Sequence, residues 1–284
     1  MFRWVNILKG FLMGVCELIP GVSSGTMALL LGIYDQFLGA ISRLLTKDFK
    51  KAVVFLIPIV LGMGLAIISM TSLMDFLLQN HTVPTHFFFL GMVLGVVPMM
   101  LRLSNVKSEF TLLHYILVVL SLLLVYFLSV IQDPDAAANA EISLSQMLFL
   151  YFAGTIGAGI MLLPGISGSL VMLILGAYPT IIYSISEFTS FNFSVTPLLI
   201  ATGLGILTGI LGASKVISYF LRNYTYLMYA AIIGLLLGSV FPIFPGLPSG
   251  GAEWSVSVIT FLSGLLISLY MGMEKRNGRQ SKKS

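Results

Sequence analysis

The chain has 284 residues, of which 57% are hydrophobic and only 9% are charged, and its mean hydropathy is +1.01. Soluble domains carry roughly 25% charged residues, so the composition excludes a soluble globular protein and predicts an all-α polytopic membrane protein. The net charge of +4 does not indicate nucleic-acid binding, because the basic residues lie in short loops between apolar runs, where they set membrane topology.

The first apolar block, residues 5–45, is interrupted by Pro20 and Gly21. Its leading part offers about 14 helical residues, a rise of about 21 Å, which is short of the ~30 Å hydrocarbon core. We therefore predict a re-entrant hairpin, a broken helix that enters the membrane and leaves on the same side. Three uninterrupted spans complete a first repeat, residues 1–140: Ala52 to Leu78, Pro84 to Leu103 and Leu112 to Val130.

Residues 141–284 repeat this pattern, with a second predicted hairpin at 146–186. Pro20 and Pro164 are 144 residues apart, and glycine, serine and tyrosine residues coincide at the same offset. Because these residue types recur in order, we interpret the pattern as an internal duplication. The three spans expected in this half are Val195 to Ser214, Tyr224 to Phe241 and Trp254 to Met271.

The basic residues predict that the two repeats are inverted. If each hairpin returns to its own side and each half crosses three times, all 15 Lys and Arg residues collect on one side. The connections on the other side, 79–83, 133–141, 187–194 and 245–253, carry none. Basic residues stay cytoplasmic, so both termini are predicted to be cytoplasmic and the second hairpin to enter from outside.

Each break is followed by small hydroxyl and glycine residues. A helix that starts inside the membrane leaves backbone N–H groups free, and such a terminus attracts anions and is capped by hydroxyl side chains. Broken helices at the repeat interface of secondary transporters use this arrangement. We predict that the breaks bind an anionic, phosphate-bearing substrate, and the candidate binding residues are Pro20, Gly21, Ser23, Ser24, Gly25, Thr26, Pro164, Gly165, Ser167, Gly168 and Ser169.

Other residues are assigned supporting roles. Glu17 is the acidic residue placed deepest in an apolar segment, which favours a protonatable coupling site or an organiser of the hydroxyl pocket. Arg43 and Arg102 are candidates for steering a phosphate to the cytoplasmic mouth. Tyr34 and Tyr178 are expected at a membrane surface as aromatic anchors. The histidines show no metal-ligand spacing, so we expect neither a metal nor a cofactor.

At these motifs the sequence resembles the polyprenyl-phosphate transporter family, the PopT-type undecaprenyl-phosphate translocases. The resemblance rests on Gly10 to Gly14, Glu17 to Thr26, Leu31 to Tyr34 and Leu163 to Ser169, and it extends from about Lys9 to Met271. Ser24 stands where the family has Gly, and Glu17 where Asp is usual. The resemblance implies a bacterial plasma-membrane flippase that returns undecaprenyl phosphate from the outer to the cytoplasmic leaflet, and not an enzyme.

Two other functions stay open. Undecaprenyl-pyrophosphate phosphatases share the inverted hairpins, but hydrolysis needs a cation and paired carboxylates, which the residues after both breaks do not supply. An ion-coupled carrier of a small soluble anion is the other alternative. Coupling to protons or sodium and the oligomeric state are also left open, and the expected partners are polyprenyl phosphate and membrane lipids.

Overall fold

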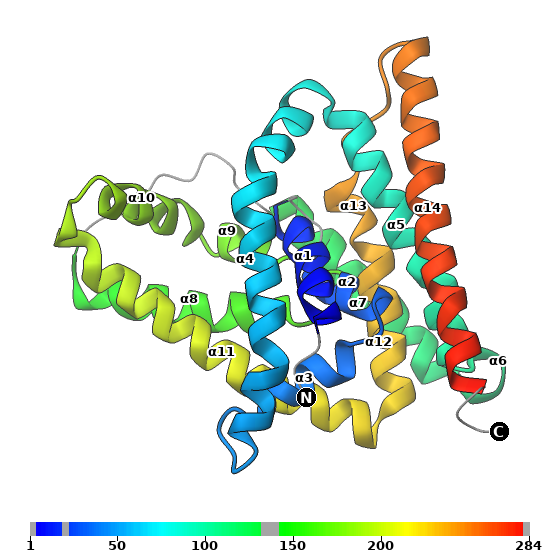
Figure 1. Cartoon of the computed structure of the whole chain (residues 1–284), viewed down its shortest axis with the longest axis horizontal. Coiled ribbons are helices and arrows are strands. Elements are labelled where there is room, and N and C mark those ends of the chain that lie inside the picture. The colour runs from blue at the N-terminus through cyan, green and yellow to red at the C-terminus, as the bar shows by residue number, and fades with distance from the viewer. Residues whose placement is uncertain (1–3, 19–22, 132–141, 281–284) are drawn as a thin grey trace.

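The computed structural model describes residues 4–18, 23–131 and 142–280, and every regular element within them is a helix (Figure 1). Its long helices are apolar and only partly buried inside the protein, as expected of segments that face lipid. The predicted class, an all-α polytopic membrane protein, is confirmed.

Seven helical segments in the described part of the chain are long and apolar enough to cross a membrane. Six of them coincide with the predicted spans, and the seventh is the first limb of the predicted second hairpin, which had not been counted as a span. The segments are α4 (Phe49–Asn80), α5 (Thr82–Leu103), α7 (Leu112–Ile131), α8 (Leu144–Met161), α11 (Thr196–Asn223) with the 3-10 turn η1 (Phe193–Val195), α12 (Thr225–Gly238) with α13 (Val240–Ile243), and α14 (Gly251–Gln280).

The first limb of the first hairpin is shorter. Helix α1 (Val5–Glu17) has 13 residues, a rise of about 20 Å, which does not reach across the hydrocarbon core. A short helix, α6 (Val106–Glu109), lies between α5 and α7. Whether either hairpin is re-entrant stays a prediction, because length alone does not decide it.

The return limb of each hairpin is not one helix but two. Helix α2 (Ser24–Leu30) is followed by α3 (Tyr34–Arg43), and α9 (Gly168–Ile174) by α10 (Tyr178–Thr189), with a bend of 108° between α9 and α10. Gly32 and Gly176 end the first helix of each pair at φ +72 and +73. Both turns are Schellman motifs: Gly32 N–H bonds Leu29 O and the next N–H bonds the carbonyl of Ala28, each at 3.0 Å.

This second bend corrects the expectation for Tyr34. The prediction assumed an unbroken helix from Pro20 outward, which would carry Tyr34 to the membrane surface. Because Gly32 turns the chain, Tyr34 instead begins α3 and is only 3% exposed. Its counterpart Tyr178 begins α10 and is 36% exposed.

Close glycine contacts join the first limb of each hairpin to the next long helix. A Cβ on Gly62 of α4 would lie 2.0 Å from the carbonyl oxygen of Ile7 in α1. A Cβ on Gly205 of α11 would lie 2.1 Å from the carbonyl oxygen of Tyr151 in α8. The two contacts join equivalent positions of the sequence repeat, so the pairs α1–α4 and α8–α11 pack in the same way.

The remaining spans pair across the halves. Helix α5 packs along α14, where Gly91 lies against the carbonyl oxygen of Phe261, and α12 packs along α7, where Gly234 lies against that of Val118. A Cβ on either glycine would come within 2.1 Å and 2.3 Å of those oxygens. Residues 91 and 234 are equivalent in the sequence repeat, and so are residues 118 and 261, because both pairs have the same offset. The two contacts therefore join the same two positions of the repeat, with the first and second halves exchanged.

These pairs leave α2 at the centre of the molecule. All seven α2 residues are buried, and Met27 to Leu30 join the main apolar core with Cys16 of α1. Residues of the second half, including Leu162 and Ile232, belong to the same core. In Figure 1, α1 and α2 lie between an arm formed by α8, α10 and α11 and the pair α5 and α14. The fold therefore brings the first break against the second half of the chain.

Candidate functional site

The first break separates α1 from α2. Pro20 and Gly21 lie outside the described residues, and the described part begins again at Ser23. Ser23 has extended backbone and caps α2, because its Oγ accepts a hydrogen bond from Gly25 N–H at 3.1 Å. The predicted capping role of this serine is therefore seen directly.

Glu17 occupies the first amide of α2. Its Oε1 accepts a hydrogen bond from Ser24 N–H at 3.3 Å, so the last residue of α1 folds back onto the helix that follows the break. A carboxylate at a helix N-terminus is stabilised by the unpaired amides there. The carboxylate of Glu17 thus lies on an amide that had been predicted to face an anionic substrate.

The second break has its own geometry. Gly165 has φ +92, and a Cβ there would lie 2.6 Å from the carbonyl carbon of Leu235, so only glycine fits for two reasons. Ser167 precedes α9, but its Oγ bonds Ser169 Oγ at 2.7 Å instead of capping the helix. Ser167 is 6% exposed and Ser169 is exposed, so this hydroxyl pair opens to the surroundings.

The two breaks touch each other. Gly165 N–H donates to Thr26 Oγ1 at 3.0 Å, and Ser23 Oγ donates to Leu163 O at 3.5 Å. A Cβ on Gly25 would lie 3.3 Å from the carbonyl oxygen of Leu162, so the backbones approach closely at this point. Residues 140 positions apart therefore form one junction of hydroxyls, amides and carbonyls, which we call the break junction: residues 23–26 with 162–165.

Sequence reasoning missed one residue that bonds to this junction. The Tyr34 hydroxyl donates to the carbonyl oxygen of Leu162 at 2.9 Å, which ties the start of α3 to the end of α8. The sequence signal for this position is Gly32, which recurs as Gly176 in the repeat and ends a helix at both places.

Not every candidate reaches the junction. Gly168 packs against α8, where a Cβ would lie 2.9 Å from Met161 Cβ. Within the described residues, no hydrogen bond joins Ser167 or Ser169 to the first break. Ser24 is buried beside Glu17.

The two arginine candidates lie at separate places. Arg43 ends α3 and lines a pocket of about 470 Å³ together with Lys9 and Lys51. Arg102 is exposed in the last turn of α5 and does not line that pocket.

The groups around the break junction can bind an anion through hydrogen bonds. Residues 17–26 and 162–169 offer hydroxyls, amides and one carboxylate, and neither stretch contains Lys, Arg or His. Stabilising the charge on a phosphoryl group in transfer needs a cation or metal. Among the described residues, no three His, Cys, Asp or Glu side chains gather where they could hold a metal ion.

Comparison with known proteins covers almost the whole chain. Residues 13–257 match the family described as VCA0040-like, undecaprenyl phosphate translocase-like. A polyprenyl-phosphate transporter of Staphylococcus aureus (strain NCTC 8325 / PS 47) is 44% identical over 273 residues, which are 95% of this chain and 96% of that protein. A polyprenyl-phosphate transporter of Vibrio cholerae serotype O1 is 31% identical over 251 residues, 84% of this chain and 76% of the relative. No solved structure matches this chain.

Proposed function

Because the chain belongs to the undecaprenyl phosphate translocase-like family, we propose that it is a membrane transporter of polyprenyl phosphate and not an enzyme. The observation that carries the proposal is the full-length similarity to a polyprenyl-phosphate transporter, which includes both break motifs. We propose undecaprenyl phosphate as the substrate, carried from the outer to the cytoplasmic leaflet of a bacterial plasma membrane.

We propose further that the halves are inverted repeats, residues 1–140 and 141–284, with both termini cytoplasmic. The reciprocal contacts of Gly91 with Phe261 and of Gly234 with Val118 support a twofold relation between the halves. The distribution of the Lys and Arg residues supports their opposite insertion. Two such halves around a central broken-helix site give a transporter that alternates its access.

The phosphate binds, in this proposal, between the two breaks. The hydrogen bond from Gly165 N–H to Thr26 Oγ1, at 3.0 Å, holds the two breaks in direct contact. The breaks must therefore separate to admit a phosphate group. Separation releases the amide of Gly165 and the hydroxyls of Ser23 and Thr26, which then become available to phosphate oxygens. The polyprenyl tail stays in lipid throughout, so no wide aqueous pore is needed.

Glu17 gives this cycle a place for coupling. Its carboxylate bonds Ser24 N–H when no phosphate is present, and two anions cannot share that position without mutual repulsion. Entry of the phosphate therefore requires Glu17 to move or to take up a proton. We propose Glu17 as the coupling residue on this ground, with a proton or sodium as the coupling ion.

The test is transport of polyprenyl phosphate in proteoliposomes by Ser23→Ala combined with Ser167→Ala. Loss of both hydroxyls is expected to abolish transport while the protein stays folded, since neither serine is part of the apolar core. The matched control is Ser104→Ala with Ser184→Ala, because these serines are also buried but bond only to carbonyls of their own helices. Wild-type transport by the first double variant would refute the assignment of the site.

A further inference from the structure

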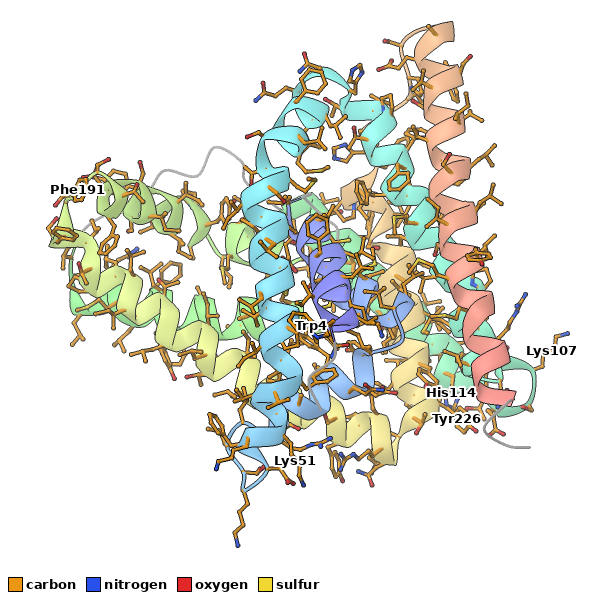
Figure 2. The ribbon with its side chains drawn as sticks, in the orientation of Figure 1. Trp4, Lys51, Lys107, His114, Phe191 and Tyr226 are labelled. Carbon is orange, nitrogen blue, oxygen red and sulfur yellow. The ribbon has the colours of Figure 1, made fainter. Side chains whose placement is uncertain are left out.

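A basic pocket lies where α1, α3 and the start of α4 meet. It has a volume of about 470 Å³, and ligand sites of small molecules begin at roughly 300 Å³. Lys51 is one of its lining residues, and Figure 2 labels it near the start of α4. The pocket does not include the break junction, although its Gly32 and Ile33 directly precede Tyr34.

Three helices each send a cation to this pocket. Lys9 comes from α1, Arg43 from α3 and Lys51 from α4, and none of the described residues that line the space is a carboxylate. Gln36, Ala40 and Arg43 are spaced by four and three residues, so they form one face of α3 toward the pocket. Charges of one sign brought together from separate helices raise the local concentration of an anion.

The second observation is a buried amide. Asn6 lines the pocket, is 4% exposed, and its side chain forms no hydrogen bond with any described residue. The side chain of Asn6 is therefore held by the surrounding packing while its amide stays open to the space beside the three cations. An amide in that position can donate to an anion that the cations attract.

One acid, Asp48, pairs with a lysine of the pocket and reduces its positive charge. Asp48 forms an ion pair with Lys51 at 2.8 Å. The hydrogen bond and the charge of Lys51 hold the pKa of the Asp48 carboxyl below its ordinary value, so Asp48 stays charged and offsets part of the positive field. The charge of Arg43 also acts on Asp48 in the same direction, more weakly than that of Lys51.

We infer that this pocket is a second phosphate-binding site, separate from the break junction, in which Lys9, Arg43 and Lys51 hold the phosphate oxygens and the Asn6 amide donates to them. Arginine and lysine together are the side chains that recognise phosphate in proteins. The phosphate comes from a lipid headgroup or is free in solution. If the phosphate belongs to a lipid, the pocket receives the transported headgroup on the side of α3 and α4. Only this role in transport rests on the proposed function.

The experiment is lysine acetylation of the purified full-length chain in uncharged detergent, read by mass spectrometry. Farnesyl phosphate is the lipid-phosphate probe and inorganic phosphate is the free one. We expect the probe to slow acetylation of Lys9 and Lys51 by about fivefold, while Lys47 and Lys50, which do not line the pocket, change little. Protection by farnesyl phosphate alone identifies a lipid headgroup, and equal protection by inorganic phosphate identifies the free anion.

Variants separate charge in the pocket from charge on the surface. Arg43→Gln with Lys51→Gln should weaken the affinity for the probe, measured through Lys9 protection, by about tenfold. Lys47→Gln with Lys50→Gln removes the same charge from the same stretch and should leave the affinity unchanged. Asp48→Asn should strengthen binding by about threefold, since it frees Lys51.

Equal protection of all four lysines, protection of none, or equal weakening by the two double variants would overturn the inference. The Ser23→Ala and Ser167→Ala protein separates this test from that of the transport site. Its Lys9 and Lys51 should remain protected even when its transport is lost, and loss of that protection would contradict a separate pocket.

Discussion

Thr26→Val tests the hydrogen bond that holds the two breaks together. Thr26 Oγ1 accepts from Gly165 N–H at 3.0 Å, and both groups are buried. Valine keeps the branched shape but leaves the amide without a partner, which costs about 1–3 kcal/mol. Separation of the breaks relieves that cost, because the amide then finds another acceptor. With a cost of about 2 kcal/mol, the population of the separated state rises by about thirtyfold.

The single cysteine of the chain reports this change. Cys16 is 2% exposed and lines, together with Thr26, a cavity of about 10 Å³ against Phe89 and Val93 of α5. We expect the movement of α2 that separates the breaks to open this cavity, so the rate of alkylation by N-ethylmaleimide should follow the population of the separated form. We expect Thr26→Val to raise the rate of Cys16 alkylation in the purified protein by about ten- to thirtyfold. Thr26→Ser keeps the hydroxyl and should label near the wild-type rate.

Thr202→Val is the matched control for a lost buried hydroxyl. Thr202 is 4% exposed, and its hydroxyl bonds only the carbonyl of Leu198 in its own helix, at 2.8 Å. It should label as the wild type does. A wild-type alkylation rate in Thr26→Val, or an equal rise of that rate in Thr202→Val, would show that this hydrogen bond does not hold the breaks together.

Three further variants test separate parts of the structure. Glu17→Gln keeps an acceptor for the α2 amide but removes the charge that competes with the phosphate. The KM for polyprenyl phosphate should therefore fall by about tenfold. An unchanged or higher KM would contradict a carboxylate that occupies the phosphate position. Gly176→Ala places a side chain on a residue with φ +73 and should lower the free energy of unfolding by about 1–2 kcal/mol. Its control, Gly212→Ala, lies in open space within α11 and should raise the free energy of unfolding by about 0.5–1 kcal/mol. Thermal unfolding in detergent measures both, and equal shifts would show that backbone strain is not the cause. Gly91→Ala places a Cβ 2.1 Å from a carbonyl oxygen of α14 and should destabilise the protein by about 1–3 kcal/mol. Its control, Gly64→Ala, has no atom within 4 Å of the new Cβ and should not destabilise the protein. Similar melting temperatures for the two variants would contradict the close packing of α5 on α14.

Local signals in the sequence predicted the spans and the two breaks. Apolar runs interrupted by proline and glycine act within a few residues, and six of the long helical segments lie where these runs predicted them. The internal repeat supported this prediction, because both halves of the chain carry a break followed by three apolar runs. The capping role of Ser23 also follows from its position beside a helix start.

What the sequence could not give was contact between distant residues. The carboxylate of Glu17 reaches Ser24 N–H only because the fold brings the end of α1 against the start of α2. The bends at Gly32 and Gly176 could not be predicted either, because a glycine in an apolar run fits helix packing as well as a helix end. The hydrophobic periodicity does not distinguish a glycine that packs against another helix from a glycine that ends its own helix.

The basic pocket was missed for a related reason. Lys9 and Lys51 are far apart in the chain and were interpreted only as topology charges, and Arg43 was grouped with Arg102, which lies elsewhere. Positive residues near the ends of spans serve topology as a rule. Only the fold shows that three of them surround one space.

The most direct test of the break junction is photo-cross-linking in proteoliposomes with a polyprenyl phosphate analogue that carries a diazirine beside its phosphate. Adducts on peptides that contain Ser23 to Thr26 and on peptides that contain Leu163 to Ser169, both displaced by unlabelled polyprenyl phosphate, are the predicted result. Adducts confined to other parts of the chain would contradict a phosphate held between the two breaks.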